Sequence, residues 1–499
     1  MHRSRPHAVA TVGVQEKQTT GRIIKGYPGY KEIRAAQSSS HLSVSSGSTG
    51  EKKQGGSILA GMVSNQQFKK DLHILMITSI YRRIICHFID QIEEAKLGEI
   101  SRFYNVFMGF LHAEQIINFM QSMGFKFVEE IDFDPNGDLT PVVKEMFFYK
   151  ENPIIFTTCG FLFFEYNDGS QKRENIVIRV YHDKGNRQVN ICIYSREREL
   201  SAKFIENLSE FTKKNSSLHG CKMRDLRIDI AEYTEIIPTQ KDSWDRYYCS
   251  PDIKKICDTE VFGLVNNVDK YREAGIERRG ILFHGDPGTG KTTLGRIICA
   301  GSGDATVLWI TPDLIGENNV GAYSVKLLYE IANFLSPSIV ICEDMDLWTN
   351  DRDDMNDTLR LGALMNILDG VNSTFGTVSI AMTNRLELME KALKNRPGRY
   401  DRIIHIPVLD TELRTQMFVD EARSQFIIDD ESFSYLVKNT DGWTGATVKE
   451  FIKGANMKFI MQDIPTTPQR HLTLDMIQDI LTTMMQFTLN HATRKKAGF

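Results

Sequence analysis

One stretch of the sequence has the residue pattern of a loop that binds phosphate groups. Residues 285–292 read Gly-Asp-Pro-Gly-Thr-Gly-Lys-Thr and match the pattern G-x-x-x-x-G-K-[ST]. An apolar run at 280–284 precedes the loop and a helical stretch follows it from Thr293, so the loop joins a predicted strand to a predicted helix. Glycines let backbone N–H groups curl around phosphates at the start of such a helix. We therefore expect the following residues to bind ATP: Gly285, Asp286, Pro287, Gly288, Thr289, Gly290, Lys291, Thr292 and Thr293.

Two side chains of this loop have defined roles in such a site. The ammonium of Lys291 is expected to reach the β- and γ-phosphates, and the hydroxyl of Thr292 is expected to hold Mg²⁺. Asp286 adds a negative charge beside the phosphates, and we expect its side chain to point to solvent. A glycine-rich loop can arise by chance, but the strand–loop–helix context makes that interpretation the weaker one.

Two acidic residues follow a second apolar run. Residues 338–342 read Ser-Ile-Val-Ile-Cys, and Glu343 and Asp344 come directly after them. Nucleotide hydrolysis with Mg²⁺ needs one carboxylate near the metal and a second one that polarises the attacking water. We predict that Glu343, with Thr292, serves the metal and that Asp344 serves the water. Their order is inverted relative to the more common Asp-Glu, so an exchange of the two roles stays open at this point.

Polar residues after a third apolar run complete the predicted catalytic set. Residues 378–382 are followed by Thr383 and Asn384, and an amide at the end of this strand can orient the attacking water. Further along, Arg396 and Arg399 lie three residues apart in a turn that contains Pro and Gly. As an isolated motif they would be surface charges. At this distance from the other motifs we predict arginine fingers, which neutralise charge that develops on the γ-phosphoryl group of a neighbouring subunit's nucleotide.

These motifs together resemble the ATPase module of the AAA+ superfamily, and within it the classical AAA clade. The resemblance covers residues 248–408 and continues in residues 440–447, which are similar to the clade's second sensor. It implies that Gly445 and Ala446 contact the nucleotide without an arginine. It also implies ATP and Mg²⁺ as cofactors. The resemblance further implies homo-hexamer rings, or heptamer rings in one branch, with ATP bound between neighbours.

Three features resemble the Bcs-type branch of the clade, the mitochondrial Rieske-protein translocases. They are residues 271–280 before the loop, the inverted acid pair within residues 343–346, and residues 364–371. Two departures accompany them. Members of this branch carry an N-terminal membrane helix, and this sequence shows none. Residues 317–319 read Glu-Asn-Asn where threading unfoldases of the clade carry an aromatic–apolar–glycine triplet, which agrees with a branch that moves folded cargo.

The composition of successive segments predicts four regions. We expect a disordered tail at 1–60, a smaller α+β domain at 61–245 that selects a partner, an α/β ATPase core with a parallel sheet at 246–408, and a helical lid at 409–499. In the α+β domain the spacing of apolar residues predicts helices within 64–125. Apolar runs predict strands there at 154–156, 161–166, 176–181, 189–194 and 226–230, and an amphipathic pattern predicts a helix at 202–214.

Composition disfavours several classes of protein. The 499 residues include 64 acidic and 60 basic ones, so the net charge of -4 lacks the basic excess that is typical of nucleic-acid binding. None of the eight cysteines shows the spacing of a zinc knuckle or redox pair, which favours buried free thiols in a reducing compartment. No apolar run reads as a membrane span, and residues 1–30 lack the apolar core of a secretory signal. We expect a cytoplasmic protein, and the basic, serine-rich N-terminal stretch leaves organelle targeting open.

Three functions are compatible with these features. The leading hypothesis is Mg²⁺-dependent ATP hydrolysis by a ring-forming ATPase that remodels or moves a protein partner. One alternative is a nucleic-acid-directed motor or loader of the same superfamily, which would need basic pore residues where residues 317–319 are acidic and polar. The other is an ATP-binding scaffold or switch that hydrolyses slowly, because the Asp344 side chain is one methylene shorter than the usual glutamate.

Overall fold

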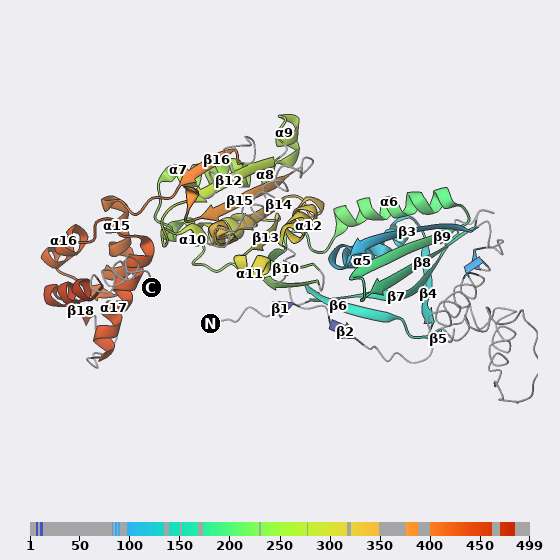
Figure 1. The fold of residues 1–499 in the computed structure, drawn as a ribbon, viewed down its shortest axis with the longest axis horizontal. Helices are drawn as coiled ribbons and strands as arrows, with labels where there is room; N and C mark the ends of the chain where they lie inside the picture. The colour runs from blue at the N-terminus through green and yellow to red at the C-terminus, as the bar shows by residue number, and fades with distance from the viewer. Residues whose placement is uncertain are drawn as a thin grey trace, which may run out of the picture. The chain divides into compact units, whose positions relative to one another are not determined.

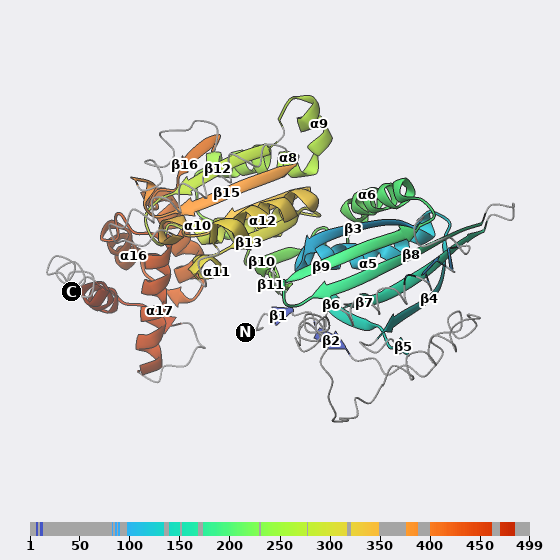
Figure 2. The ribbon, with the colours of Figure 1, turned by 45° about the vertical axis from the view of Figure 1, so that its right-hand side comes forward.

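The computed structural model describes most of the chain in two compact units, which Figures 1 and 2 show. The N-terminal unit comprises residues 7–217 and 227–232, and the C-terminal unit comprises residues 1–6, 218–226 and 233–499. The predicted domain boundaries stay predictions. Of the predicted tail, only five residues in two short strands are described. The described residues are 6–7, 10–12, 82, 85–86, 88–89, 97–133, 139–149, 152–167, 173–228, 231–276, 278–316, 321–348, 376–387, 400–461 and 470–484.

An antiparallel sheet forms the N-terminal unit. Its strand order is β2-β6-β7-β8-β9-β3, and β4 pairs with β7 and with the short β5. Helices α5 and α6 pack on this sheet and against each other, and Figure 1 shows α6 alongside β3 and β9. The bounds are β2 (Ala10–Val12), β3 (Gly98–Asn105), α5 (Val106–Ser122), β4 (Lys126–Phe133), β5 (Leu139–Thr140), β6 (Val143–Tyr149), β7 (Asn152–Asn167), β8 (Arg173–Asp183), β9 (Gln188–Ser195) and α6 (Arg198–Asn215).

Strand β7 lies in the middle of this sheet, and both of its faces are buried at residues 161–164. Phe161 and Phe163 point to one face, where they pack in a cluster with Ile85 and Phe88. Leu162 and Phe164 alternate with them along the strand and point to the other face, where they are buried too. A strand that is covered on both faces reads as a continuous apolar run, which explains why four apolar residues stand next to one another here.

Two predictions for this part of the chain are wrong. Residues 98–105, inside the stretch predicted to be helical, form β3, and helix α5 begins only at Val106. Strand β3 pairs with β9 along its whole length, and this tertiary pairing overrides the local helical pattern. The strand predicted at 226–230 is instead β10 (Lys222–Arg227), which lies parallel to β13 in the sheet of the C-terminal unit.

The remaining predictions for the N-terminal unit agree with the structure. The runs predicted as strands at 176–181 and 189–194 lie in β8 and β9, and the helix predicted at 202–214 lies in α6. The two runs at 154–156 and 161–166 belong to the single long strand β7. Their separation in the sequence reflects a change of partner, because β7 pairs with β6 up to residue 159 and with β4 from residue 161.

A sheet with parallel strands forms the centre of the C-terminal unit, as predicted. Its strand order is β1-β11-β10-β13-β14-β15-β12-β16, and the pairs from β10 to β16 are parallel. Strands that are neighbours in space are far apart in sequence, so helices connect them across the faces of the sheet. The bounds are β1 (Pro6–His7), β10 (Lys222–Arg227), β11 (Glu232–Glu235), β12 (Arg278–His284), β13 (Thr306–Ile310), β14 (Ser338–Cys342), β15 (Thr377–Thr383) and β16 (Arg402–His405).

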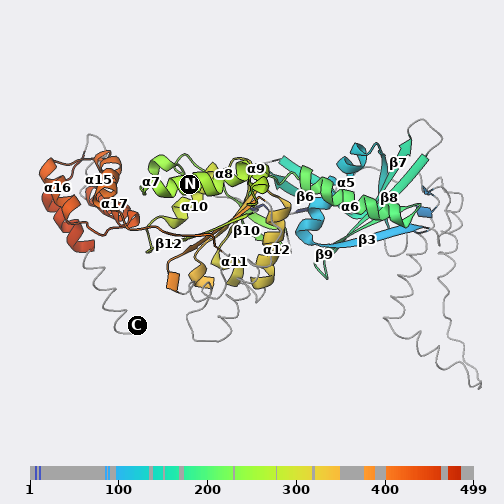
Figure 3. The same ribbon diagram turned by 90° about the horizontal axis from the view of Figure 1, so that it is seen from above.

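Helices cover both faces of this parallel sheet. Helices α7, α8 and α10, with the π-helical η3 between α7 and α8, form one apolar layer, and α12 packs against β13 and β14 on the other face (Figure 3). On the α12 side, the hydroxyl of Tyr329 lies 2.5 Å from that of Ser379 on β15. The bounds are η2 (Trp244–Arg246), α7 (Pro251–Ile256), η3 (Cys257–Phe262), α8 (Gly263–Asn266), α9 (Val268–Glu273), α10 (Lys291–Gly301), α11 (Pro312–Gly316), α12 (Gly321–Phe334) and η4 (Met345–Trp348).

The helices after residue 410 build an apolar core of their own, to which Phe418 and Phe451 belong. Two of them begin at an aspartate whose side chain accepts a hydrogen bond from the first turn, Asp410 before α15 and Asp429 before α16. Among all described helices, none is long and apolar enough to cross a membrane. The bounds are α15 (Thr411–Phe418), η5 (Val419–Arg423), β17 (Phe426–Ile427), α16 (Asp430–Lys438), α17 (Gly445–Met461), β18 (Arg470–His471) and a helix at 474–484.

A buried histidine lies in the helix layer of the N-terminal unit. His112 of α5 is 0% exposed, its ring stacks on Tyr104 with 4.2 Å between centroids, and its Nδ1 lies 2.7 Å from the carbonyl oxygen of Met108. Burial lowers the pKa of His112 to about 4, and the hydrogen bond to Met108 opposes that shift. The pKa of His112 is lower in the folded state than in the unfolded one. The free energy of unfolding is therefore unaffected by this histidine above about pH 6.5, and it decreases as the pH falls toward 4.

We expect the free energy of opening α5 to fall by about 2 kcal/mol between pH 7.5 and pH 5. At pH 5 His112 binds a proton once α5 has opened, whereas its buried ring in the folded state stays neutral. Hydrogen exchange of peptides from residues 106–122, corrected for the intrinsic rate at each pH, measures this change. His112→Gln should remove the pH dependence, whereas the same substitution at the exposed His471 should leave it intact. Equal corrected protection of wild-type α5 at both pH values would contradict the prediction.

Candidate active site

The ends of three neighbouring strands bring the predicted site residues together. Strands β14, β15 and β12 lie side by side and are parallel, and His284 at the end of β12 is in register with Thr383 at the end of β15. The loop from residue 285, the acids from residue 343 and the side chain of Asn384 therefore leave the same edge of the sheet. This edge, outside the carboxyl ends of the strands, is the usual ligand position in open parallel sheets.

A cavity of about 400 Å³ opens at this edge. Gly285, Asp286 and Glu343 do not line it: the carbonyls of the first two accept hydrogen bonds from Lys291, and Glu343 accepts one from Thr292. Asp286 is exposed, as expected for a side chain that points to solvent. The predicted residues that do line the cavity are Pro287, Gly288, Thr289, Gly290, Lys291, Thr292, Thr293, Asp344, Asn384, Gly445 and Ala446.

The loop has room for phosphates only because of its backbone conformation. Gly288 has a φ of 83°, and a Cβ atom there would lie 2.9 Å from the Cβ of Ala446, so a larger residue would collide with the lid. Helix α10 begins at Lys291, directly after the loop. The first N–H groups of a helix have no partner within it and form its positive end, so they offer donors for an anion here.

Lys291 is buried at the bend of the loop. Its ammonium donates hydrogen bonds to the carbonyl oxygens of Gly285 at 2.7 Å and Asp286 at 2.9 Å. Burial lowers the pKa of Lys291, and the negative charges of Asp344, Asp346 and Asp286 act in the opposite direction. A cation in this place can attract the phosphates of a nucleotide that enters the cavity.

Thr292 and Glu343 have the oxygen atoms to hold a magnesium ion that binds as a complex with a nucleotide. The Thr292 hydroxyl donates to Oε1 of Glu343 at 2.5 Å, and Glu343 is 8% exposed. The described residues contain no group of three His, Cys, Asp or Glu side chains that could hold a metal alone. Mg²⁺ commonly takes one or two protein oxygens and completes its shell with phosphate oxygens and water, which is the donor set that this pair can supply.

Asp344 and Asn384 lie on the cavity wall as a second polar pair. The Asn384 amide donates to Oδ1 of Asp344 at 3.3 Å, and Asp344 has a left-handed φ of 45° that is uncommon for aspartate. Burial, and then the charges of Glu343 and Asp346, raise the pKa of Asp344. Asp346 also holds Asn384 in place, because its Oδ1 accepts hydrogen bonds from the Asn384 backbone N–H at 3.0 Å and from the Thr383 hydroxyl at 2.9 Å.

The helices after residue 410 close the cavity from another side. The backbone N–H of Ala446, in the first turn of α17, donates to the carbonyl of Gly288 in the loop at 3.2 Å. Just before α17, the carbonyl of Trp443 accepts a hydrogen bond from the N–H of Leu409 at 3.3 Å. Leu409 also lines the cavity, so the start of this helical segment and the start of α17 are tied together at the site.

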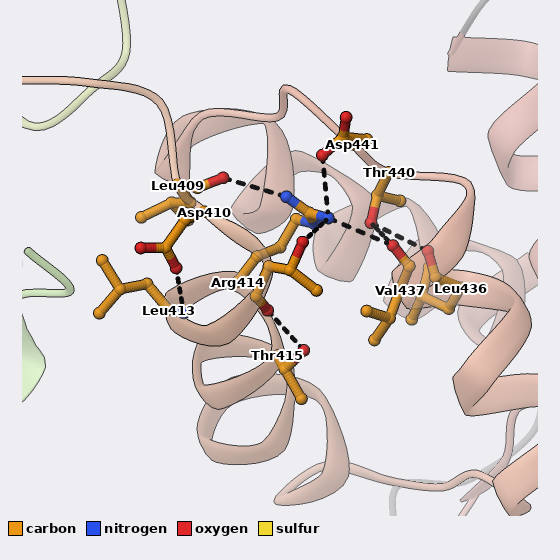
Figure 4. Close-up of polar contacts among 10 residues, drawn as sticks. Leu409, Asp410, Leu413, Arg414, Thr415, Leu436, Val437, Thr440 and Asp441 are labelled. Atoms are coloured by element: carbon orange, nitrogen blue, oxygen red, sulfur yellow. Dashed lines mark hydrogen bonds and ion pairs between the residues drawn. The ribbon is translucent and has the colours of Figure 1, made fainter.

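A buried arginine stabilises that arrangement (Figure 4). Arg414 is 1% exposed and donates to the carbonyls of Leu409 at 3.0 Å and Val437 at 3.4 Å, and to the Asp441 carboxylate at 3.3 Å. Val437 is in the last turn of α16, where the negative end of the helix dipole favours a cation. Arg414 thus connects three segments whose positions set the lid side of the cavity. Sequence reasoning missed it, because a single arginine in an amphipathic helix usually lies in solvent.

Comparisons with known proteins agree with this geometry. Residues 281–408 match the family described as ATPase family associated with various cellular activities (AAA). The chain carries an AAA ATPase domain. Strands β13 to β16, the loop between β12 and α10 and the acids after β14 all lie within the matched residues, so the resemblance found in the sequence is correct at the level of the AAA family.

Curated relatives match this domain and its surroundings. The ATP-dependent zinc metalloprotease FtsH 2 of Thermoanaerobacter sp. (strain X514) is 31% identical over 209 residues, which are 41% of each chain. The proteasome-activating nucleotidase of Methanopyrus kandleri is 30% identical over 295 residues, 52% of this chain and 64% of that protein. This chain therefore spans less than two thirds of either relative. Among solved structures, the AAA domain of FIGL-1 in complex with ADP matches with a TM-score of 0.41 and 21% identity over 51% of this chain and 90% of that one.

Several predicted residues of the AAA domain lie outside the described part of the chain. These are Arg396 and Arg399, predicted as arginine fingers, and residues 317–319, which stand at the position of the pore triplet. The segment 364–371, one of the three features that resemble the Bcs-type branch, lies outside it as well.

Six residues line the cavity without having been predicted from sequence. They carry no motif, and they come from segments before β12 and after β16 that only the folded chain brings to the loop. Lys449 is one turn beyond Gly445 on α17, at the spacing that places both on one face of the helix. That spacing is the one signal that could have indicated it. The six are Arg246, Tyr247, Tyr248, Leu409, Met417 and Lys449.

Lys449→Ala should weaken nucleotide binding about 2- to 10-fold, because it removes a cation from the lid side of the cavity and a hydrogen bond of this kind contributes about 0.5–1.5 kcal/mol. Titration with a fluorescent ATP analogue measures the change. Lys453→Ala is the matched control: Lys453 lies one turn further along α17, pairs with Glu450 at 3.2 Å and does not line the cavity. Equal affinities of both variants and the wild type would show that Lys449 does not contact the nucleotide.

Proposed function

We propose that this protein is a Mg²⁺-dependent, ring-forming ATPase that remodels or moves a protein partner. One observation carries the proposal: Lys291, Thr292, Asp344 and Asn384 line one cavity of about 400 Å³, and Glu343 is hydrogen-bonded to Thr292 directly behind its wall. A cation for phosphates, an oxygen pair for the metal and a carboxylate for water are the parts that phosphoryl transfer to water requires.

Each of these groups has a separate part in the reaction. Lys291 and the N-terminal turn of α10 bind the phosphates and hold the γ-phosphoryl group in position. Mg²⁺, when bound, neutralises charge that develops on the phosphate oxygens. Asn384 orients the attacking water, and Asp344 accepts a proton from it while the water attacks the γ-phosphorus.

The contacts favour one assignment of the two acids over its reverse. Both carboxylate oxygens of Glu343 are engaged, one by Thr292 at 2.5 Å and the other by the indole of Trp309 at 2.9 Å, and Glu343 does not line the cavity. Asp344 does line the cavity and lies beside the amide that can hold water. This difference supports Glu343 with Thr292 as the metal pair and Asp344 as the base.

Assembly into a homo-hexamer or heptamer ring is part of the proposal. It follows from the likeness to the AAA family, in which neighbouring subunits complete each other's nucleotide site. In that arrangement Arg396 and Arg399 reach the γ-phosphate of the next subunit, and Gly445 and Ala446 contact the nucleotide from the lid.

A protein is the proposed partner. The relatives are named a metalloprotease and a proteasome-activating nucleotidase, so the names of both refer to work on proteins. The net charge of -4 lacks the basic excess that is typical of nucleic-acid binding, and the sequence Glu-Asn-Asn at 317–319 contains no basic residue. The same triplet lacks an aromatic side chain to grip an unfolded chain, so we propose movement of a folded cargo, as in the Bcs-type branch.

Lys291→Ala should lower ATP affinity about 10- to 100-fold, since it removes a charged hydrogen bond to the phosphates. Asp344→Asn should keep ATP binding and lower turnover about 10²- to 10⁴-fold, since it removes the base. Steady-state phosphate release and nucleotide titration of the purified full chain distinguish the two effects. Asp304→Asn, an exposed position outside the cavity, is the matched control.

The same assay tests the proposal against its two alternatives. Wild-type protein that binds ATP yet releases no phosphate above background would favour the slow ATP-binding switch. Phosphate release that requires DNA or RNA would favour a nucleic-acid motor. Retention of full turnover by Lys291→Ala would refute the assignment of the phosphate-binding loop itself.

Arg399→Ala should lower turnover by about 10³- to 10⁵-fold if the arginine acts on a neighbour's nucleotide. Mixing it with Lys291→Ala subunits should restore part of the activity, because some interfaces then join an intact loop to an intact finger. Phosphate release over a range of mixing ratios, with assembly followed by light scattering, measures this. Activity at background in every assembled mixture would rule out an arginine that acts between subunits.

A further inference from the structure

The carboxylate of Glu343 has a hydrogen-bond partner for each of its oxygens. Oε1 accepts a hydrogen bond from the hydroxyl of Thr292 at 2.5 Å, and Oε2 accepts one from the indole Nε1–H of Trp309 at 2.9 Å. Trp309 is 3% exposed. The first contact belongs to the proposed metal pair, whereas the second comes from a residue of β13 that is part of no motif.

Strand register explains how Trp309 reaches this carboxylate. Trp309 pairs with Ile341 of β14, and Glu343 follows Ile341 by two residues, which is the spacing that places both on one face of the sheet. The indole also packs against α10, where a Cβ on Gly295 would lie 2.7 Å from the ring. Gly295 and Thr292 are three residues apart on that helix and share a face. The ring therefore fills the space beside the helix face that carries Thr292.

A charged donor approaches the same oxygen from the neighbouring strand. Arg224 of β10 is in register with Trp309 of β13, and its Nη2 lies 4.0 Å from Oε2 of Glu343. Donors from three elements, α10, β13 and β10, thus surround one carboxylate. A group that only accepts hydrogen bonds suits such a position.

We propose that Trp309 is a positioning residue for the acid that serves Mg²⁺, an inference that rests on the function proposed above. The indole N–H holds Oε2, and this keeps Oε1 at Thr292. An aspartate at 343 would be one methylene shorter and would lose one of the two contacts. Trp309 therefore accounts for glutamate at 343 in the inverted acid pair. Outer partners of this kind orient metal-binding carboxylates, and their removal commonly weakens metal affinity.

Trp309→Phe tests this proposal because it keeps an aromatic ring in the core and removes the indole N–H together with the five-membered part of the indole. The measurement is the Mg²⁺ concentration that gives half-maximal binding of a fluorescent ATP analogue to the full chain. We expect this concentration to rise about 10- to 100-fold. Binding of the analogue in EDTA should stay unchanged, because the loop and Lys291 are intact. An unaltered Mg²⁺ dependence would overturn the proposal.

Trp348→Phe provides a matched control. Trp348 is also buried, and its indole donates to the backbone carbonyl of Glu343 at 3.0 Å instead of to the carboxylate. A loss of Mg²⁺ affinity equal to that of Trp309→Phe would indicate general loosening and would overturn the proposal. Tryptophan emission gives a second readout. Its change on addition of Mg²⁺ with nucleotide should vanish in Trp309→Phe and persist in Trp348→Phe.

Glu343→Asp keeps the test conclusive if Trp309→Phe folds poorly, because it leaves the ring in place and should raise the required Mg²⁺ concentration to a similar degree. Where both variants fold, the double variant should bind Mg²⁺ no more weakly than either single one, because each change removes the same contact. Additive losses would overturn the proposal. Wild-type nucleotide binding that does not depend on Mg²⁺ would instead refute the proposed function, so the two failures are distinguishable.

Discussion

The hydrogen bond between Thr292 and Glu343 is the contact on which the site of the AAA domain depends. It joins the first turn of α10 to the end of β14, and its 2.5 Å length fixes the phosphate-binding loop relative to the acid pair. Parallel strands alone only place loop and acids at one edge of the sheet. This contact decides which acid stays at the helix and which one, Asp344, is left on the cavity wall beside Asn384.

The lid depends on a second set of contacts, which centre on a buried charge. Arg414 is 1% exposed, and its two terminal nitrogens donate to two carbonyls and one carboxylate from three segments. The backbone N–H of Ala446 in turn donates to the carbonyl of Gly288, so the lid contacts the backbone of the phosphate-binding loop. A few hydrogen bonds therefore join the lid to the phosphate-binding loop.

Strand β10 belongs to the parallel sheet, and the chain on both sides of it belongs to the N-terminal unit. The chain leaves the N-terminal unit at residue 217, supplies β10 to the sheet of the C-terminal unit and returns for residues 227–232. Arg224 of β10 is in register with Trp309, and both approach the oxygen of Glu343 that does not contact Thr292. The acid proposed to serve the metal is thus supported by a strand that connects directly to the N-terminal unit.

The sequence alone determined the parts whose chemistry is local. The loop, the two acids and Asn384 could be predicted, because a glycine-rich turn and polar residues at strand ends are patterns that a few consecutive residues are enough to identify. Only the tertiary structure decided the rest. Strand pairing assigned residues 98–105 to β3 against their helical pattern, and it placed β10 in the parallel sheet. Trp309 and Arg414 look like ordinary core and surface residues in sequence. Their partners are fixed by strand register and helix packing, which depend on contacts between distant segments that no local pattern contains.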